Sequence, residues 1–379
     1  MKASSGRRRP VRWTSKEQPA LNEESRADGP ETRGDNARMD IRQVVITRTG
    51  APERLRLQTS RLDPPAPGEA QVEVVAAGIN FADILARQGL YPDAPPLPLV
   101  VGYEVSGTVR AVGTGVEESL VGQDVLALTR FGGYSSALNV PAAQVFAKPG
   151  VLSHAEAASI PVAYLTAWQL LVVQGGLREG DTVLIQNAGS GVGLAALDIA
   201  RHVGARTIGT ASAGKHDFLA ARGLDHAVDY RTGDWTREVR ALTDDRGVEL
   251  VIDPLGGESF RRSRSVLRPT GRLGMYGVSA ASSNQGLRGK LQLARTAALM
   301  PLFHPVPLMN ANQGAFGVNL GHMWDEVDRL RGWMGQVLEG VGSGWVRPHV
   351  DSSYPLADAG RAHEHIEARR STGKVVLEP

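Results

Sequence analysis

Gln186-Asn187-Ala188-Gly189-Ser190-Gly191-Val192-Gly193 is the stretch that decides the fold of this chain. It follows the apolar run from Thr182 to Ile185 and leads into residues 192–203, whose apolar side chains recur at helical spacing. A glycine-rich turn between a buried strand and a helix brings backbone N–H groups and the positive helix end against a pyrophosphate. The stretch therefore predicts a dinucleotide site at Ala188, Gly189, Ser190, Gly191, Val192 and Gly193, with a plain tight turn as the alternative.

The residues after Asp181 alternate between strand and helix patterns. Apolar runs of strand length are followed by helical patterns in the order 182–185 then 192–203, 207–209 then 215–222, 227–229 then 235–242, 250–252 then 259–267, and finally 272–275. Such an alternation predicts a doubly wound parallel sheet of the Rossmann kind.

The segments on either side of this part have a different pattern. Residues 41–161 contain short β-rich runs broken by Pro and Gly, and strands at 345–350 and 374–377 are expected around a helix at 356–369. The fold class is therefore α/β, a β-rich domain with an inserted Rossmann doubly wound parallel-sheet domain. We expect a disordered tail at 1–38 that precedes a true start at Met39, the first domain at 39–164, the cofactor domain at 165–304, and a return to the first domain at 305–379.

Composition excludes several classes of function. A net charge of +2, from 42 basic and 40 acidic residues, gives no field strong enough to indicate nucleic acid or membrane binding. The absence of cysteine excludes disulfides, thiolate metal sites and a cysteine nucleophile. No segment reaches the roughly 18 uninterrupted apolar residues that a membrane helix needs. We expect a cytoplasmic protein without a nucleic-acid partner or an integral membrane segment.

The end of the second Rossmann strand bears on the choice of cofactor. Sheets that bind NAD usually carry an acidic residue there, which would repel a 2′-phosphate. Here the segment is Gly209-Thr210-Ala211-Ser212-Ala213-Gly214-Lys215, and no acidic residue occurs before Asp217. Hydroxyl groups at Thr210 and Ser212 and the Lys215 ammonium suit a phosphate, which favours NADPH; the alternative is a solvated Lys215 at a helix start.

Three motifs together carry a resemblance to a known family. Gly78-Ile79-Asn80-Phe81-Ala82-Asp83, Leu97-Pro98-Leu99-Val100-Val101-Gly102-Tyr103-Glu104 and the glycine turn are similar to zinc-free quinone oxidoreductases of the medium-chain dehydrogenase/reductase superfamily, the zeta-crystallin-like group. The resemblance spans about residues 40–379, and the vesicle-protein-like branch is the most similar. It implies a GroES-like catalytic domain, a Rossmann domain, NADPH as cofactor and a homodimer.

No zinc site is expected. Zinc-dependent relatives of this family carry a histidine where Tyr103 stands and a cysteine near Asn80. The pair His363 and His365 cannot replace these ligands, because residues two apart on a helix point to different sides. We expect the two histidines to lie on a solvated helix face. Without a Lewis acid, reduction of an electrophilic quinone or enone is favoured over alcohol oxidation.

The resemblance also implies roles for single residues. Asn80 and Asp83 resemble residues that line the nicotinamide, and Tyr91 resembles a tyrosine that assists enolate protonation in enoyl thioester reductases of the superfamily. The other residues resemble cofactor contacts: Thr166, Lys215, Tyr230, Tyr276, Gly277, Ser279, Phe316, Val318, Asn319 and Lys374. For Tyr91, simple packing beside the loop Pro92 to Pro98 remains the alternative.

The sequence leaves three functions open. The first is an NADPH-dependent quinone or enone reductase, and the second is an enoyl-thioester reductase in lipid or polyketide synthesis. Arg288, Lys290 and Arg295 could anchor the carrier phosphate of a thioester, although such charges usually lie on a solvated helix face. The third is a non-catalytic NADPH-binding, membrane-peripheral protein, for which the amphipathic stretch Leu287 to Leu302 could touch a bilayer; the same stretch also suits a dimer interface or a pocket lid.

Overall fold

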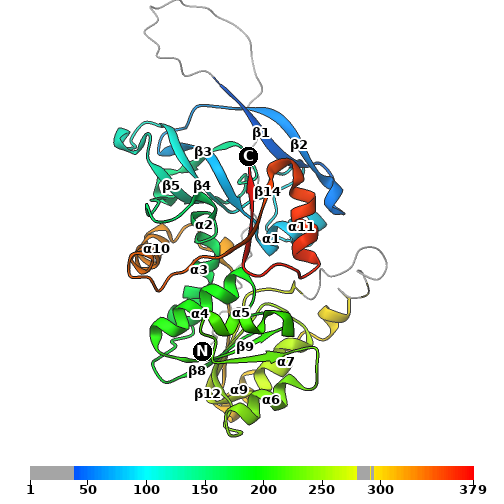
Figure 1. Ribbon diagram of the computed structural model, residues 1–379. Helices are drawn as coiled ribbons and strands as arrows, with labels where there is room; N and C mark the ends of the chain where they lie inside the picture. Colours follow the sequence, from blue (N-terminus) through cyan, green and yellow to red (C-terminus); the bar gives the residue numbers. More distant parts are fainter. Residues whose placement is uncertain (1–37, 280–290, 292–293) are drawn as a thin grey trace, which may run out of the picture. The chain divides into compact units, whose positions relative to one another are not determined.

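The computed structural model describes residues 38–279, 291 and 294–379. Within these residues the strands form a six-stranded sheet, a seven-stranded sheet and a two-stranded ribbon (Figure 1). Of the expected tail, residues 1–37 lie outside the described residues, as do Arg288 and Lys290.

The Rossmann part is a parallel sheet in the order β10-β9-β8-β11-β12-β13. Its strands are β8 (Thr182–Ile185), β9 (Arg206–Ala211), β10 (His226–Asp229), β11 (Val248–Asp253), β12 (Leu267–Met275) and β13 (Gly314–Gly317). Its helices are α4 (Gly191–Val203), α5 (His216–Ala221), α6 (Trp235–Leu242), α7 (Glu258–Ser265) and α9 (Pro305–Ala311). The chain reverses direction across the sheet between β8 and β11, and this switch point leaves a crevice at their carboxyl ends. The doubly wound sheet is confirmed.

Alternating side chains of β8 bury both faces of this sheet. Val183 and Ile185 belong to a cluster with α4 and α3 (Pro161–Trp168), whereas Leu184 belongs to a cluster with Trp235 of α6 and Phe260 of α7. Because successive side chains of a strand point to opposite faces, an unbroken apolar run is what a two-sided sheet requires.

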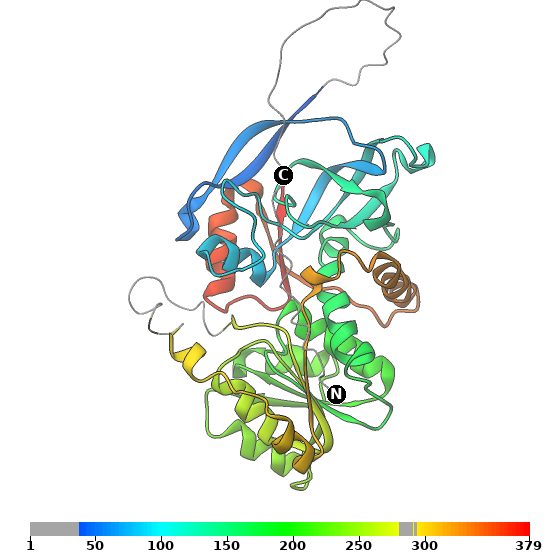
Figure 2. The same cartoon turned by 180° about the vertical axis from the view of Figure 1, so that it is seen from behind.

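The β-rich part has the sheet order β14-β15-β3-β4-β5-β7, with β6 paired to β3. Its elements are β3 (Glu69–Gly78), α1 (Phe81–Gln88), β4 (Glu104–Val112), β5 (Asp124–Leu128), β6 (Ala137–Pro141), β7 (Val145–Ala147), α2 (His154–Ala157), β14 (Val350–Pro355), α11 (Ala359–Glu367) and β15 (Lys374–Glu378). The hairpin of β1 (Met39–Ile46) and β2 (Leu55–Leu62) is antiparallel. Strands from both ends of the chain therefore complete one domain (Figure 2).

Two predictions about the C-terminal part are wrong. The return to the first domain does not begin at 305, because β13 pairs with β12 and closes the Rossmann sheet. The strand expected at 345–350 begins only at Val350, and helix α10 (Val327–Gly342) precedes it. Residues 343–349 instead form a crossing segment, in which the Trp345 ring packs on Gly340 and the Arg347 N–H donates to Asp198.

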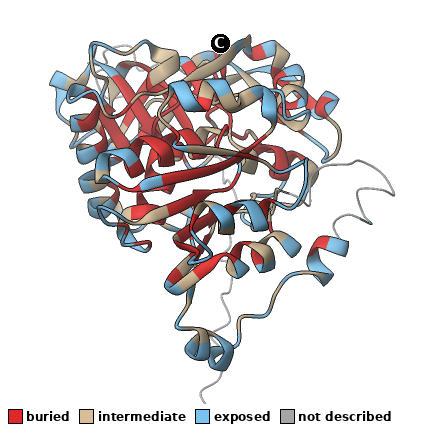
Figure 3. Cartoon of the chain, turned by 60° about the horizontal axis from the view of Figure 1, so that its bottom comes forward, coloured by how far each residue is buried: buried red, intermediate tan, exposed pale blue. Residues whose placement is uncertain are grey.

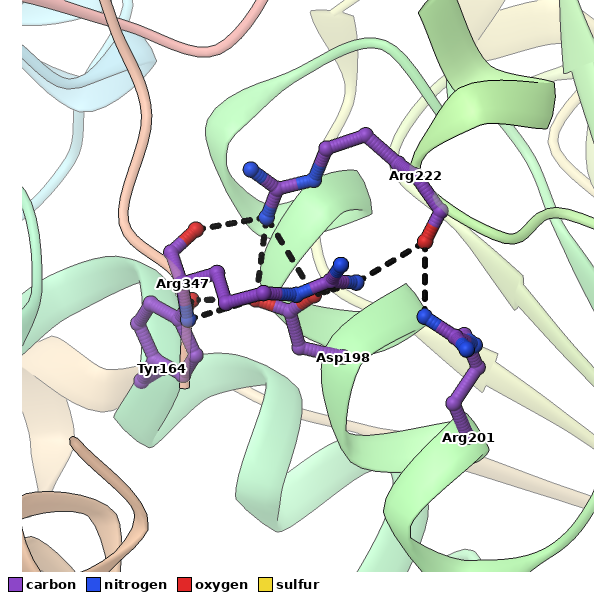
Figure 4. A network of polar contacts seen from close by, with 5 residues as sticks. All are labelled: Tyr164, Asp198, Arg201, Arg222 and Arg347. Atoms are coloured by element: carbon purple, nitrogen blue, oxygen red, sulfur yellow. Dashed lines mark hydrogen bonds and ion pairs between the residues drawn. The ribbon is translucent and has the colours of Figure 1, made fainter. Parts of the chain in front are cut away.

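Asp198 holds this crossing segment against α3 and α4 (Figure 4). Its fully buried carboxylate accepts hydrogen bonds from the Tyr164 hydroxyl at 2.7 Å and from the guanidinium groups of Arg222 and Arg347 at 3.0 and 2.9 Å. The carbonyl oxygen of Arg222 in turn accepts from Arg201 and Arg347. One carboxylate thus joins segments that are far apart in the sequence.

Burial follows this architecture, with buried strands and exposed outer helices (Figure 3). In the described part of the chain, the helical stretch His154–Val173 is long and apolar enough to cross a membrane by length and composition alone, but 78% of its window is buried inside the protein. Leu165, Leu170 and Leu171 in this stretch belong to the core around α4.

Candidate active site

A cavity of about 1310 Å³ lies at the carboxyl ends of the Rossmann strands and is closed on its other side by the start of α1 and by the C-terminal return. Many residues predicted from the sequence line it: Asn80, Tyr91, Thr166, Gly189, Ser190, Gly191, Val192, Thr210, Ser212, Lys215, Tyr230, Tyr276, Gly277, Ser279, Val318, Asn319 and Lys374. The structure therefore brings most of the predicted site together.

Four predicted residues do not line the cavity. Ala188 and Gly193 are buried behind the glycine turn, where a Cβ on Gly193 would lie 2.6 Å from the carbonyl oxygens of Ala188 and Asn187. The ring of Phe316 packs over Gly274 in the sheet. Asp83, in the first turn of α1, is fully buried. These residues shape the site from behind and do not face a ligand.

The glycine turn has the geometry of a phosphate cradle. Ser190 caps α4 by accepting a hydrogen bond from the Gly193 N–H at 3.1 Å, and Asn187 adopts a positive φ of 57°. A Cβ on Gly191 would lie 2.6 Å from Cδ of Lys374, so any side chain there would collide with the cavity wall. The α4 N-terminus therefore presents N–H groups toward the cavity, as a pyrophosphate requires.

Thr210 fixes the turn to the neighbouring strand. Its hydroxyl donates to Gln186 Oε1 at 2.6 Å and accepts from the Asn187 N–H at 3.1 Å, and its carbonyl oxygen accepts from the Ala188 N–H. Thr210 thus orients the turn, in addition to lining the cavity.

Basic groups gather at the cavity end beyond β9. Lys215 reaches the carbonyl oxygen of Ser371, and burial lowers the pKa of its ammonium. Partial burial raises the pKa of Tyr230, but hydrogen bonds and charge from Arg231 and Arg369 outweigh this effect and hold the pKa below its usual value. Arg369 also lines the cavity and was missed, because the sequence pattern placed it at the end of a helix and gave no sign that it lies beside the cavity. This end can hold a phosphate dianion.

Asn80 lies at the opposite end, where its side chain meets two buried charges. Asn80 Nδ2 donates to Glu104 Oε1 at 2.8 Å, and its Oδ1 accepts from Lys374 Nζ at 2.8 Å. The aliphatic stem of Lys374 lies against Gly191, so the same residue contacts the glycine turn and Asn80. Glu104 was not selected from the sequence, where it appeared only as the last residue of a motif.

Asp83 is corrected from a candidate catalytic residue to a buried support. Its carboxylate accepts from the N–H groups of Asn80 at 2.7 Å and Gly102 at 2.9 Å and from the Tyr134 hydroxyl at 3.3 Å. Burial raises its pKa to about 7 against these hydrogen bonds, which lower it. As the third residue of α1, it reaches back to the Asn80 N–H and fixes the start of the helix.

Aromatic side chains surround the cavity near Asn80. Tyr91 packs edge to face on Tyr103 with ring centroids 6.2 Å apart. Burial, followed by the charge of Asp93, raises the pKa of Tyr91, so its phenol stays protonated at neutral pH. Phe81, Leu320, Met323 and Trp324 complete this part of the wall. It suits a flat apolar molecule with few polar groups.

Two tyrosine hydroxyl groups lie buried in the cavity wall, each beside another side chain of the site. The Tyr103 hydroxyl interacts with Tyr91 and the Tyr276 hydroxyl with Ser190, although neither contact has the geometry of a standard hydrogen bond. The glycine cradle and the basic end are therefore the parts of the wall that fit a phosphorylated dinucleotide.

The donor set does not fit zinc. Where zinc-dependent relatives have cysteine and histidine, Asn80 and Tyr103 offer an amide and a phenol, neither of which is a usual zinc ligand. Within residues 38–279, 291 and 294–379, no group of His, Cys, Asp or Glu is arranged to hold a metal ion. Arg295 lines the cavity, and Arg288 and Lys290 lie outside these residues.

The expected solvated face for the histidine pair is wrong. His363 is fully buried, and its Nε2 lies 2.9 Å from the Tyr134 hydroxyl. His365 is partly buried, with Nε2 2.9 Å from Asp351. The two do point apart, as their spacing requires. Helix α11 presents His363 to the sheet. The apolar residues on the same side of the helix, and not the polarity of the imidazole, determine that His363 is buried.

Two family models match this chain. Residues 66–150 match the alcohol dehydrogenase GroES-like domain, and residues 222–377 match the zinc-binding dehydrogenase model. The first match covers the β-rich sheet with Asn80 and Glu104, and the second covers the later Rossmann strands and the C-terminal return.

Individual proteins are similar over most of the chain. The human synaptic vesicle membrane protein VAT-1 homolog is 36% identical over 342 residues, which cover 89% of this chain and 86% of that protein. A mycobacterial protein solved with NADPH is 31% identical, with a TM-score of 0.78 over 89% of this chain and 100% of that chain. A mycobacterial quinone oxidoreductase structure is 32% identical, with a TM-score of 0.74 and coverage of 89% and 100%. The CurK enoyl reductase is 27% identical, with a TM-score of 0.76 and coverage of 89% and 99%.

Proposed function

Because this chain belongs to the zinc-free quinone oxidoreductase family of the medium-chain dehydrogenase/reductase superfamily, we propose that it reduces quinones or α,β-unsaturated carbonyls with NADPH and without a metal. The observation that carries the proposal is that one continuous cavity joins the glycine cradle, a basic end and the aromatic wall around Asn80. Similarity to a mycobacterial protein solved with NADPH supports the choice of cofactor.

The chain's own residues hold the cofactor at three points. The N–H groups of Gly191 and Val192 at the start of α4 receive the pyrophosphate, while Lys215, Tyr230 and Arg369 receive the 2′-phosphate. Tyr276 and Thr166 line the way towards Asn80 at the nicotinamide end. Bound NADPH supplies the hydride.

At the acceptor end, the residues orient the substrate and exclude water. Tyr91, Tyr103 and Trp324 offer flat apolar surfaces for a ring, and Asn80 offers an amide N–H to an oxygen that gains negative charge. Tyr91 carries a neutral phenol beside this space, which can donate a proton to an enolate. Quinone reduction ends on oxygens, which exchange protons readily, and does not depend on this donor.

A second function is supported by a specific observation. The similar CurK enoyl reductase and the Tyr91 phenol on the cavity wall both favour reduction of an enoyl thioester. Arg295 of the predicted set lines the cavity and can contribute one positive charge towards a carrier phosphate, whereas Arg288 and Lys290 lie outside the described residues.

We also propose that two copies of the chain pair through the edge of the Rossmann sheet. Among the described strands, β13 is the last in this sheet, and the preceding segment exposes Leu302 by 86%, Val306 by 59% and Met309 by 64%. An unpaired edge beside exposed apolar side chains is typical of an interface. Light scattering after size exclusion, with Val306→Asp as the disrupting variant, tests this proposal.

The function is tested by following NADPH oxidation with ortho-quinones, para-quinones, enones and enoyl thioesters. We expect turnover of quinones or enones that a metal chelator does not change. Gly191→Leu, which fills the cradle, abolishes both binding and turnover, whereas Gly150→Leu, where a Cβ meets nothing within 4 Å, has no effect. Faster turnover of thioesters would favour the enoyl reductase, and NADPH binding without any turnover would favour a binding protein.

A further inference from the structure

Glu104 and Lys374 form a buried ion pair directly behind Asn80. Lys374 Nζ lies 2.6 Å from Glu104 Oε1, and the side chains are 7% and 0% exposed. The same ammonium donates to the Ile79 carbonyl oxygen at 2.7 Å and to Asn80 Oδ1 at 2.8 Å. A lysine ammonium has three N–H groups, so each of them already has an acceptor inside the protein. The ammonium therefore has no N–H left for a cofactor, although its stem lines the cavity.

The pair dictates which way the Asn80 carboxamide points. A lysine ammonium only donates, so the atom that faces it must be the amide oxygen; an ionised carboxylate only accepts, so the atom that faces Glu104 must be the amide nitrogen. Exchanging the two ends of the amide would replace both charge-assisted hydrogen bonds by repulsive contacts. Asn80 consequently uses its oxygen and one N–H internally, and its second N–H is the polar hydrogen left for the cavity.

The surroundings are built to keep this arrangement. The second oxygen of Glu104 accepts from the Val162 N–H at 2.7 Å, which ties it to the start of α3. At Gly78, a Cβ would lie 2.5 Å from Glu104 Oε1 and 2.5 Å from the Ala158 carbonyl oxygen. Glycine at this position is thus what allows the carboxylate to approach the backbone. A satisfied network of buried charges specifies geometry more than it adds stability.

We propose that Glu104 and Lys374 are positioning residues that hold the Asn80 amide so that it presents an N–H, and never its oxygen, to the oxygen of the hydride acceptor. This role rests on the proposed reductase function for its effect on turnover. The structural part, the fixed orientation of Asn80, stands without it. Glu104 does not line the cavity, and the ammonium of Lys374 has no N–H left for the substrate.

The test combines Glu104→Gln with Lys374→Met, so that no buried charge is left unpaired. Glutamine both donates and accepts, and therefore no longer selects one orientation of Asn80. We expect kcat for the best acceptor to fall by about tenfold to a hundredfold, because a misplaced donor loses the transition-state hydrogen bond. The KM for NADPH should change by less than about twofold, because methionine keeps an apolar stem against Gly191 and the lost ammonium already gives all its N–H groups to Glu104, Ile79 and Asn80.

A double-mutant cycle with Asn80→Ala separates positioning from general damage. Once Asn80 is absent, the paired substitution should have no further effect on kcat, because the pair acts through Asn80. Losses that simply multiply in the cycle would overturn the proposal. Asp198→Asn serves as the control for reduced stability, since Asp198 is buried in a network away from the cavity lining.

A spectroscopic measurement distinguishes failure of this proposal from failure of the proposed function. With asparagine selectively labelled with ¹⁵N, the Asn80 side-chain signal is identified by its loss in Asn80→Ala. We expect one of its two amide protons to be shifted by the carboxylate bond in the native protein and to return to an ordinary position in the paired variant. An unchanged signal overturns the positioning role even in an active enzyme, whereas a shifted signal without any turnover overturns only the reductase function.

Discussion

The N–H of Gly373 donates a hydrogen bond to the carbonyl oxygen of Gly189 at 2.8 Å, so the last strand of the chain starts on the glycine turn. Ser190 and Gly373 also form an isolated parallel bridge. The turn was predicted from its own sequence, but this second support comes from residues nearly two hundred positions further along the chain.

Gly373→Ala should weaken both stability and NADPH binding. Gly373 has a φ of 90°, and a Cβ there would lie 2.6 Å from the His349 carbonyl oxygen. We expect the free energy of unfolding to fall by about 1–3 kcal/mol, with a rise in the Kd for NADPH. Denaturant unfolding and fluorescence titration measure the two effects. Gly344→Ala is the matched control, because its φ is 78° but nothing lies within 4 Å of a Cβ; equal effects at both positions would refute the clash.

Arg369→Ala should change the preference between the two nicotinamide cofactors. Arg369 lines the basic end of the cavity and lowers the pKa of Tyr230. Loss of one charge-assisted hydrogen bond should raise the KM for NADPH by about tenfold and leave that for NADH unchanged. The neighbouring Arg370 does not line the cavity, so Arg370→Ala should leave both constants as they are. Equal losses with both cofactors would place the 2′-phosphate elsewhere.

The parts of this site that follow from local pattern could be predicted from the sequence. The glycine turn and the segment after β9, which lacks an acidic residue, can each be recognised from a few consecutive residues. Both segments line the cavity. Glu104 and Arg369 could not be selected, because their importance depends on contacts with Lys374 and Tyr230 from other segments. Burial of Asp83 and His363 likewise depends on tertiary packing, which overrides the polarity of a single side chain.

The predicted boundaries of the C-terminal part are wrong for a related reason. Residues 345–350 are rich in β-forming side chains, but Arg347 is tied to Asp198 and Trp345 to Gly340, so the segment crosses between domains and pairs only from Val350 onward. The short strand β13 contains two glycines and gave no strand signal, although it completes the Rossmann sheet.

Asp198→Asn should destabilise the protein without changing its chemistry. The substitution removes the negative charge that pairs with Arg222 and Arg347 (Figure 4). Breaking one partner of a buried ion pair costs about 3–5 kcal/mol of unfolding free energy, and the half-exposed Arg347 places the expected loss at the lower end. Denaturant unfolding measures it. Asp244→Asn, at an exposed pair with Arg246, should change stability by less than about 0.5 kcal/mol, and a similar loss at both sites would show that burial is not the cause.

Asp83 should give the protein a stability that falls as the pH rises. Burial raises its pKa to about 7 from the ordinary 3.8, so between these values the folded protein binds a proton that the unfolded chain has released. The contribution of Asp83 to the free energy of unfolding is therefore complete below about pH 4 and decreases as the pH rises to about 7. Above that pH it does not change further, and the total decrease is on the order of 4 kcal/mol at most. The free energy of unfolding should differ less between about pH 5 and about pH 8 in Asp83→Asn than in the native protein. An equal difference would mean that Asp83 does not titrate in this range.

Tyr91→Phe distinguishes the two acceptor classes. Its phenol is protonated at neutral pH, since burial and the Asp93 charge raise its pKa, and it lies on the cavity wall beside Tyr103. Reduction of an enone or an enoyl thioester needs a proton on carbon, which water delivers poorly inside a closed site, so turnover of these acceptors should fall by about a hundredfold. Quinone turnover should change by less than about twofold, because both electrons and protons end on oxygen atoms. The ring of phenylalanine keeps the packing on Tyr103, so a loss shared equally by quinones and enones would mean that Tyr91 orients the acceptor through its hydroxyl and does not deliver the proton.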